Sequence, residues 1–569
     1  MPPTGKNNVE TISISNQSKV EADTMIHDKG DAVSSASLES QAHGEGGLKR
    51  SLKSRHLTMI SLGGVIGQGL FLSSGGNLAA AGPAGSLIAY AIIGFIVFWV
   101  TFSLGEMATY IPVSGSFTIF CRRFVDDSFG ATIGWNYWAC WAIIVASELT
   151  ALPLVMNFWT EKVPSWAWSG IWLIVIFVLN LFGARSYGEA EYWFSVIKIL
   201  AVLIFIIVGC FTSGGVIGDE VYGFKYWVSP GAFTNGALGV VNAFVLASFS
   251  MQGTEIVGIT AGECGNPRKE VPRAIRNVFW RIIIFYLGSG KLVYNLILLI
   301  ILLIYFSSLV FVMGMIVPSN DPRNLDSSSG TATVSPFTIV FQKSGISGIT
   351  HIMNAVILIT VLSCANSGMY VASRTLCALS QEGLAPRKLA HITNRGVPIY
   401  ALLCTAFISL ITFATSFIPG KALFIVLTKL SGVAGFVTWG GISFAHYRFR
   451  KAYISQGRKL SDLPFVAPCY PFGDIFGMIA CIVIALMAGY SYFSPASAVG
   501  LIGNYAGLIL CAAGFITTKL WTKSKMVPID QIDLDTGRMD MDYSSFEDEP
   551  EVTGPWYKRW GAKLIAIIT

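Results

Sequence analysis

Residues 63–71, Gly63-Gly64-Val65-Ile66-Gly67-Gln68-Gly69-Leu70-Phe71, lie in the middle of the first apolar stretch long enough to span a membrane. Four of the first seven residues are glycine, and each weakens a helix by about 1 kcal/mol relative to alanine. Broken backbone at this depth is tolerated only inside protein or beside a water-filled cavity, because hydrocarbon offers no hydrogen-bond partners. The segment therefore predicts either an unwound helix that presents backbone groups to a small solute, or glycines that only allow close helix packing.

The composition is that of a polytopic membrane protein. Of 569 residues, 53% are hydrophobic and 13% are charged, whereas soluble domains carry roughly 25% charged residues. The net charge of +6 does not indicate nucleic-acid binding, because the basic residues lie between apolar segments. The 10 cysteines show no paired or metal-type spacing, so we predict neither a disulfide framework nor a metal site, and we expect no cofactor.

The chain contains twelve apolar stretches of transmembrane length. They fall near 56–76, 84–110, 130–158, 165–183, 189–213, 237–260, 278–317, 347–380, 397–418, 422–446, 474–493 and 499–521. Residues 1–53 are polar and predict a disordered cytoplasmic N-terminal tail. Residues 54–523 form the predicted twelve-helix domain, and the polar, acidic residues 524–569 form a cytoplasmic C-terminal tail.

Basic residues are placed as expected for twelve crossings with both tails in the cytoplasm. The fifteen basic residues of the predicted inner loops are Arg122, Arg123, Arg185, Arg268, Lys269, Arg273, Arg276, Arg387, Lys388, Arg395, Arg448, Arg450, Lys451, Arg458 and Lys459. The five of the outer loops are Lys162, Lys225, Arg323, Lys343 and Lys421. If the overlong stretch 278–317 crossed twice, the basic loops that follow it would lie outside, so a single crossing fits better.

A second interruption lies in the sixth stretch, at Ser250-Met251-Gln252-Gly253-Thr254-Glu255-Ile256. It places a glycine, two hydrogen-bonding side chains and a carboxylate at membrane depth. Breaks in the first and sixth helices occupy equivalent positions of two five-helix repeats with inverted topology. The matched breaks favour an all-α membrane protein with a 5+5 inverted repeat, two further helices, and unwound segments that bind a solute.

Further motifs occur in almost every predicted span. They include Leu104-Gly105-Glu106-Met107, Pro112 to Phe117, Tyr187-Gly188-Glu189-Ala190-Glu191, Gln252 to Glu255 running into Thr260 to Glu263 and Asn266-Pro267, Ala365-Asn366-Ser367, and Gly383-Leu384-Ala385-Pro386. On these motifs the chain resembles, over about residues 50–545, the fungal amino-acid permeases of the amino acid–polyamine–organocation superfamily (the yeast amino-acid transporter family). The resemblance implies the leucine-transporter-type fold and proton-driven uptake of amino acids across the plasma membrane, without enzymatic activity. Gln68 departs from the family, which commonly has threonine there.

A zwitterionic amino acid needs donors for its carboxylate and acceptors for its ammonium in one dry cavity. Backbone N–H groups at the first break supply donors and a favourable helix dipole, and carbonyl groups at the second break supply acceptors. The predicted substrate-binding residues are Ile66, Gly67, Gln68, Gly69, Glu148, Ser250, Met251, Gln252, Gly253, Thr254 and Ser431.

Three of the predicted polar residues have more than one interpretation. Glu148 lies deep in the apolar third stretch, where it would accept a cationic side chain, take part in proton movement, or bond to a neighbouring helix. Glu255 would serve gating or helix-to-helix bonding as readily as ligand contact. Ser431, among small residues of the tenth stretch, suits either a wall that sorts side chains or plain close packing. Glu106, Glu189 and Glu191, nearer the inner ends, predict solvated or salt-bridged roles.

Lys198 lies about ten residues into the fifth stretch, which is deep for a lysine that extends to the surface. Burial disfavours its charged form, so the side chain would lose and regain a proton as water access alternates. By resemblance to proton-coupled members of the superfamily, its ammonium occupies the place of the cation that sodium-coupled relatives bind. The predicted proton-coupling set is Lys198, Glu255, Ser363 and Asn366.

The sequence leaves the transported side chain open, with neutral or broad-range substrates ahead of basic ones. The alternatives are a non-transporting nutrient sensor of the same fold and a choline or polyamine transporter. A channel needs no matched helix breaks and no buried lysine. Lys6, Lys19 and Lys29 lie in the predicted N-terminal tail, where permeases of this family receive ubiquitin before endocytosis, so ubiquitin-ligase and endocytic machinery are candidate partners.

Residues 290–308 have no counterpart in the family pattern and are mostly Leu, Ile, Tyr and Val. The segment starts with Gly290-Lys291, the dipeptide that a splice-donor sequence would encode if it were translated. We hypothesise that this segment is a translated intron and that the seventh helix joins 278–289 directly to 309–317; the competing interpretation is a real insertion folded as a hairpin. We predict that the main spliced transcript lacks these codons. Sequencing a transcript that retains them as its main form would exclude the intron.

Overall fold

The computed structural model describes a helical protein. It describes residues 56, 59, 67, 69–111, 113, 115–218, 220–256, 259, 309–323, 335–346, 348–418, 420–463, 465–490, 493 and 498–538. Every regular element within these ranges is a helix, which confirms the predicted all-α class. The predictions for residues 1–53, 290–308, Ile66 and Gln68 lie outside the described residues.

The helices follow one another along the chain with short connections. They are η1 (Gly69–Ser73), α3 (Ser74–Tyr110), α4 (Phe117–Phe124), α5 (Asp127–Met156), α6 (Ser165–Asn180), α7 (Ala184–Ser213), η2 (Trp227–Gly231), α8 (Gly236–Met251), α12 (Pro336–Lys343), α13 (Ile349–Gln381), η4 (Arg387–Ala390), α14 (Ile399–Ser409), η5 (Leu410–Ser416), α15 (Gly420–Ser455), η6 (Leu460–Asp462), α16 (Phe472–Met487), α17 (Ala498–Thr522) and η8 (Ile529–Gln531). Residues 309–316 are also helical.

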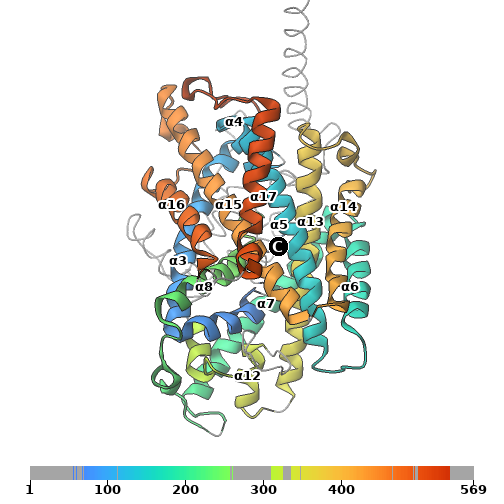
Figure 1. Ribbon diagram of the computed structural model, residues 1–569, viewed down its shortest axis with the longest axis vertical. Helices are drawn as coiled ribbons and strands as arrows, with labels where there is room; N and C mark the ends of the chain where they lie inside the picture. The colour runs from blue at the N-terminus through green and yellow to red at the C-terminus, as the bar shows by residue number, and fades with distance from the viewer. Residues whose placement is uncertain are drawn as a thin grey trace, which may run out of the picture.

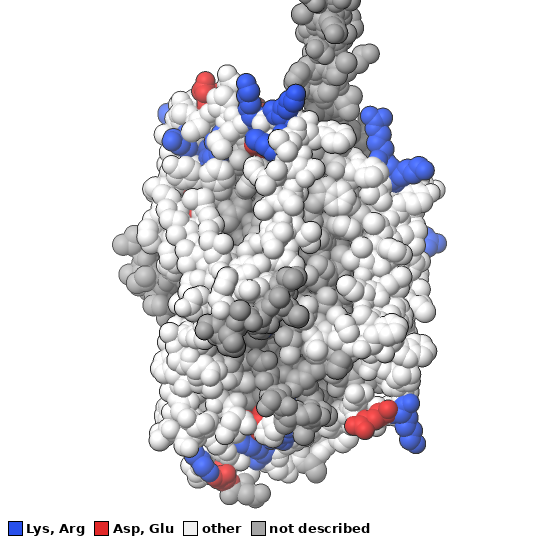
Figure 2. All heavy atoms as spheres, in the orientation of Figure 1, with Lys and Arg blue, Asp and Glu red and all other residues white. Residues whose placement is uncertain are grey.

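Seven helices of the described part are long and apolar enough to cross a bilayer, and three shorter apolar helices, α6, α8 and α16, accompany them. Figure 1 shows α5 and α13 near the centre, with α6 and α14 on one flank and α3 and α16 on the other. Figure 2 shows charged side chains gathered at the two ends of the visible face, with a wide and nearly uncharged band between them. This distribution is that of a polytopic membrane protein. We call the end where α4 lies the α4 end.

The described helices match ten of the twelve predicted spans, namely α3, α5, α6, α7, α8, α13, α14 with η5, α15, α16 and α17. The remaining two, near 56–76 and 278–317, are described only towards their C-terminal ends, so the count of twelve stays a prediction. Helix α15 continues to Ser455, past the predicted end at 446, because Arg448 and Arg450 on its last turns are buried and paired.

A sharp corner separates the first and second predicted spans. Gly82 has φ 74° and ψ 175° and precedes Pro83, so α3 consists of a short segment and a long segment that point in different directions. A Cβ atom at residue 82 would lie 2.7 Å from the carbonyl oxygen of Ala232. That carbonyl instead accepts a hydrogen bond from Ala84 N–H (3.0 Å), and Thr234 N–H donates to the Ala81 carbonyl (3.1 Å). The corner's backbone groups are thus satisfied by the loop before α8.

Helix α8 ends inside the predicted second interruption. Its last helical residue is Met251, Gln252 takes an extended conformation (φ −64°, ψ 146°), and Gly253 has φ 106°, a left-handed value that favours glycine. Residues 252–255 form a turn, and helical geometry returns at Ile256. The chain therefore unwinds where its sequence loses helix-forming residues.

Residues 524–538, the described part of the predicted C-terminal tail, are fastened to the α4 end, and we call them the C-terminal strap. Ile532 and Leu534 are buried there. Val527 N–H donates to the Val125 carbonyl (2.9 Å), and Gln456 Nε2 donates to the Ile532 carbonyl (2.8 Å). The strap therefore joins the connection between α3 and α5 to the end of α15.

An ion pair completes the strap. Arg458, just beyond α15, binds Asp535 through Nη1 to Oδ1 (2.9 Å) and Nη2 to Oδ2 (2.7 Å). This guanidinium holds the pKa of the Asp535 carboxyl below its usual range. The contact is therefore complete above the ordinary pKa of an aspartate and is lost only as the pH falls through the lowered value.

Candidate functional site

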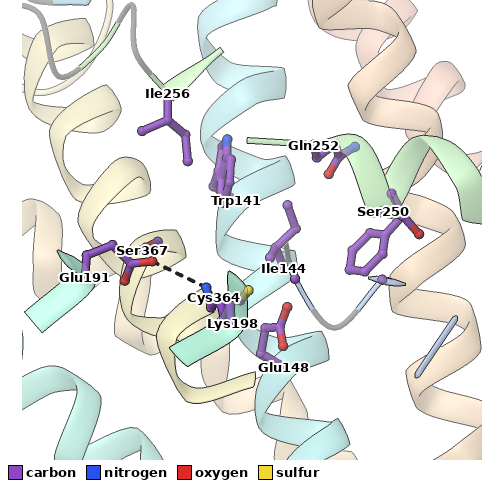
Figure 3. A pocket seen from close by; sticks show the side chains of 13 residues that line it. Trp141, Ile144, Glu148, Glu191, Lys198, Ser250, Gln252, Ile256, Cys364 and Ser367 are labelled. Atoms are coloured by element: carbon purple, nitrogen blue, oxygen red, sulfur yellow. Dashed lines mark hydrogen bonds and ion pairs between the residues drawn. The ribbon is translucent and has the colours of Figure 1, made fainter. Parts of the chain in front are cut away.

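A single cavity brings together residues from both helix interruptions and from α5, α7 and α13. The space between its atoms, including its open mouth, measures about 410 Å³. The lining residues are Gly67, Gly69, Trp141, Ile144, Glu148, Glu191, Lys198, Phe249, Ser250, Gln252, Ile256, Cys364 and Ser367. Figure 3 shows Glu191, Ser367 and Lys198 on one side, Ser250 and Gln252 on the other, and Trp141, Ile144 and Glu148 of α5 between them.

The two interruptions touch each other at the cavity. A Cβ atom on Gly69 would lie 2.5 Å from Ser250 Cα and 2.9 Å from Ser250 N, so only glycine permits this approach of two backbones. The hydroxyls of Ser250 and Tyr90 lie 3.0 Å apart, which fastens α8 to α3 beside the contact. The N–H groups of Leu70 and Phe71 turn back to the Gly67 carbonyl (3.1 and 3.4 Å). Helix η1 therefore begins beside the cavity.

The turn after α8 is held from two neighbouring helices. Gln252 Nε2 donates to the Ser431 carbonyl on α15 (2.7 Å), and Cys140 Sγ on α5 lies 3.8 Å from Gln252 Oε1. A Cβ atom on Gly435 would lie 2.2 Å from Gln252 Nε2, so α15 is shaped to accept this amide. The backbone carbonyl of Ser431 thus holds the Gln252 side chain, and Ser431 itself does not line the cavity.

Glu255 is bound within the turn and does not line the cavity. Its carboxylate accepts from Gly253 N–H and Thr254 Oγ1, each at 3.3 Å. Tyr137 of α5 and Trp439 of α15 also donate to it, each at 3.4 Å. Of the two roles predicted for Glu255, this geometry favours helix-to-helix bonding.

A buried ion pair forms one wall of the cavity. Lys198 Nζ lies 3.4 Å from Glu191 Oε1, seven residues earlier on α7, and both side chains are almost fully buried. Ser363 of α13 donates from Oγ to both carboxylate oxygens, at 2.7 and 2.8 Å. Ser363 is therefore linked to Lys198 by the Glu191 carboxylate, which binds both side chains. Asn366, the other predicted neighbour, accepts a hydrogen bond from Asn180 of α6 (2.9 Å).

Glu148 forms the part of the lining contributed by α5, between the two sides of the cavity. Its side chain is 2% exposed, and Oε2 has no hydrogen-bond partner among the described residues. A buried carboxylate oxygen without a partner is energetically unfavourable and marks a place where a donor or a cation is required. The chemistry available here is the binding of a positively charged group.

The cavity gathers six of the predicted residues that the structure describes: Gly67, Gly69, Glu148, Lys198, Ser250 and Gln252. Met251, Gly253 and Thr254 lie in or beside the turn without lining it. The roles of all these residues stay predictions. Seven lining residues were not among the predicted site residues, and they are Trp141, Ile144, Glu191, Phe249, Ile256, Cys364 and Ser367.

Helical spacing is the signal that would have identified two of the omitted residues. Glu191 precedes Lys198 by seven residues, or two helical turns, so both face the same side of α7. It is buried and ion-paired with Lys198, which agrees with the salt-bridged role and differs from the solvated one. Trp141 precedes Glu148 by seven residues on α5 in the same way.

Comparison with known proteins assigns this architecture. A family model described as "Amino acid permease" matches residues 56–530. The chain belongs to the amino acid permease family. This membership confirms the predicted family and confirms a transporter rather than an enzyme. The permease's helices and cavity are therefore those of a multi-pass membrane carrier of amino acids.

Several characterised permeases are similar over most of their length. The lysine-specific permease LysP of Lactococcus lactis is 42% identical over 497 residues, covering 86% of this chain and 93% of that protein. The lysine-specific permease of Saccharomyces cerevisiae is 40% identical over 536 residues, covering 92% and 84%. The general amino-acid permease GAP2 of Candida albicans is 39% identical over 510 residues, covering 88% and 83%.

The backbone contact at Gly69 gives a direct test of the cavity. We predict that Gly69→Ala reduces uptake by about tenfold or more, because a Cβ atom there overlaps the Ser250 backbone. Such overpacking costs roughly 1–3 kcal/mol, and about 1.4 kcal/mol corresponds to a tenfold change in affinity. Initial uptake rates of a labelled amino acid, normalised to surface protein, measure this. The matched control is Gly514→Ala on α17, where nothing lies within 4 Å of the new methyl. Equal uptake by the two variants would contradict the prediction.

Proposed function

We propose that this permease imports cationic amino acids, lysine among them, together with protons across the plasma membrane of a fungal cell. The sequence pattern favoured neutral or broad-range substrates, with basic ones close behind. The buried Glu148 oxygen that has no hydrogen-bond partner among the described residues is the observation that reverses this order.

The balance of charges among the buried side chains of the cavity supports a cationic substrate. Glu148, Glu191 and Lys198 all line the cavity, and with their ordinary charges they sum to −1. Because ions at membrane depth are stable only when they are paired, the cavity is completed by one further positive charge. The side-chain ammonium or guanidinium of a basic amino acid supplies that charge at Glu148. Its α-carboxylate and α-ammonium then bind the backbone groups at the two helix breaks.

The names of similar permeases point the same way. Two of the relatives described above are lysine-specific, and a further one is a "Basic amino-acid permease" of Saccharomyces cerevisiae. The general permease among them keeps broad-range transport as the second candidate. Trp141 and Ile144 support lysine equally, because an apolar wall suits the methylene groups that precede its ammonium.

For coupling we propose that Lys198 carries the proton. Its ion pair with Glu191, which Ser363 holds in place, gives the ammonium a fixed partner inside the cavity. Loss of that proton would break the pair and change the contact between α7 and α13. Glu255 is a less suitable carrier, because four donors already surround its carboxylate.

The proposed topology has twelve transmembrane helices of the leucine-transporter type, with a 5+5 inverted repeat and two additional helices. The α4 end is the cytoplasmic end in this topology, since Arg122 and Arg123 lie on α4 and Arg448 donates to the Phe124 carbonyl at its end. Both tails would be cytoplasmic, which makes Lys6, Lys19 and Lys29 accessible to ubiquitin ligases.

One uptake assay distinguishes the proposed function from the alternative functions. A nutrient sensor binds the amino acid without accumulating it, and a choline or polyamine transporter ignores the α-carboxylate. Uptake of labelled lysine into permease-deficient cells, with competition by arginine, leucine, choline and spermidine, distinguishes these functions. Lack of concentrative lysine uptake would exclude the proposed function.

Glu148 provides the specificity test. We predict that Glu148→Gln weakens lysine binding by on the order of 10- to 100-fold, because a hydrogen bond to a charged group contributes about 1.5–3 kcal/mol. Binding of neutral amino acids should change much less. KM values for lysine and leucine measure the difference, with Glu161→Gln as the matched control on an exposed loop residue. An equal change for both substrates would contradict a role in recognising cationic side chains.

Lys198 provides the coupling test. We predict that uptake by the unmodified permease rises as external pH falls and collapses with a protonophore, whereas Lys198→Met binds or exchanges substrate without accumulating it. Lys198→Arg should also fail to accumulate, because an arginine is effectively never deprotonated. Accumulation ratios in vesicles with an imposed pH gradient measure this, with Lys162→Met as the exposed control. If Lys198→Met accumulates in proportion to the gradient, another group carries the proton.

A further inference from the structure

A second buried cluster of ionisable side chains lies near the α4 end, apart from the cavity. It is formed by Glu106 near the end of α3, His446 and Arg450 on the last turns of α15, and Asp474 in the first turn of α16. Each of the four side chains is 3% exposed or less, and the cavity lining includes none of them. Family membership and the proposed transport mechanism assign them no role.

The carboxylate of Glu106 is saturated with donors. Arg450 Nε donates to Oε1 (2.6 Å), and Arg450 Nη2 donates to Oε2. The backbone N–H of Ala467, in the connection between α15 and α16, also donates to Oε2 (2.5 Å). Such a fork-to-fork pair is among the strongest arrangements available to buried charges.

His446 lies between the two carboxylates. Its Nδ1 is 2.8 and 2.9 Å from the two oxygens of Asp474, and its Nε2 is 3.3 Å from Glu106 Oε1. The first contact is a hydrogen bond, and the second is an ion-pair approach. Ser103 of α3 donates to Asp474 Oδ1 (2.7 Å), so α3 and α16 both contribute to this contact.

The surroundings of the ring favour one protonation state. A neutral imidazole has a lone pair on one nitrogen, which would face a carboxylate oxygen in either tautomer, whereas an imidazolium places a positive charge between both carboxylates, with a hydrogen bond at Nδ1 and an ion-pair contact at Nε2. Charge balance agrees: Glu106 and Asp474 contribute −2, Arg450 contributes +1, and only a protonated His446 brings the sum to zero. Among the described residues, the ionisable side chain of Tyr470 also faces this pair, and its ring lies 5.4 Å from the Arg450 guanidinium and 6.4 Å from the His446 ring.

We propose that His446 is a second protonation site of this permease, an imidazolium that stays charged throughout transport and locks α3, α15 and α16 together at the α4 end. Removing its proton leaves a net charge of −1 in a buried position, so the ring does not exchange protons as a carrier would. The inference requires neither the proposed substrate nor Lys198 as the coupling group. It assigns His446 to positioning the helices that flank the cavity.

The direct test observes the unmodified protein. Nitrogen-15 NMR of the purified permease with labelled histidine resolves its 6 histidines, and the spectrum of His446→Gln assigns the missing signal. We expect both ring nitrogens of His446 to carry protons throughout about pH 6–8, where an unperturbed histidine changes state. A ring that loses a proton in this range would overturn the proposal.

A charge-compensation series tests the lock. His446→Gln leaves the cluster at −1 and Asp474→Asn leaves it at +1, so each should lower the Tm by several degrees. The double variant restores a sum of zero and should recover much of the loss. Additive losses in the double variant would overturn the proposal. The matched control neutralises Glu220 and Lys225, which form an exposed ion pair, singly and together. These variants should change the Tm little.

Uptake by the double variant distinguishes a lock from a carrier. A stable double variant has no ring to titrate, yet we expect it to keep the pH-dependent accumulation of the unmodified permease. Loss of accumulation together with an unchanged Tm would show that His446 belongs to the proton path and would overturn the proposal. If the permease transports an amino acid other than the proposed cationic ones, the uptake assay will show it, and the expected NMR and Tm results for His446 do not change.

Discussion

The backbone contact between Gly69 and Ser250 is the constraint on which the rest of the structure depends. Helix α8 ends and helix η1 begins at this contact, and the two backbones approach so closely that even a methyl group does not fit. Their ends leave N–H and C=O groups that the helices themselves cannot satisfy. Hydrocarbon cannot satisfy them either, so α5, α7 and α13 must enclose the junction. A polar cavity in the middle of an apolar protein follows from this one contact.

Buried charge is treated in two different ways in this molecule. In the cavity, Glu148 keeps an oxygen without a hydrogen-bond partner among the described residues, and the charges do not sum to zero. Near the α4 end, Glu106 and Asp474 are surrounded by donors and balanced by Arg450 and His446. In the proposed function the unbalanced group meets its partner in the substrate, whereas the balanced cluster is proposed to hold helices together. The same residue types therefore have different roles, set by whether their partners belong to the protein.

Sequence patterns predicted the described helices and the break after Met251 because these features are local. Apolar length predicted ten spans that the structure describes, and the Ser250–Ile256 segment predicted where α8 ends. The site was predicted in part, because Glu191 was judged by its distance from the predicted end of the span rather than by the face it shares with Lys198. Arg450 was counted as a loop charge, yet it is buried against Glu106. Pairing across 344 residues has no local signal.

The C-terminal strap was also beyond local patterns, because its acidic composition resembles that of a solvated tail. Its attachment affects how the protein is handled in the laboratory. A chain cut after residue 538 would end at a defined place beside Tyr110 and Val113, since Arg538 lies 5.4 Å from the Tyr110 ring and Gly537 packs against Val113. A fluorescent reporter or affinity tag joined there is anchored to the α3–α5 connection. Shortening the chain before Val527 would instead uncover the apolar surface that Ile532 and Leu534 bury, and such a surface is what cellular quality control recognises.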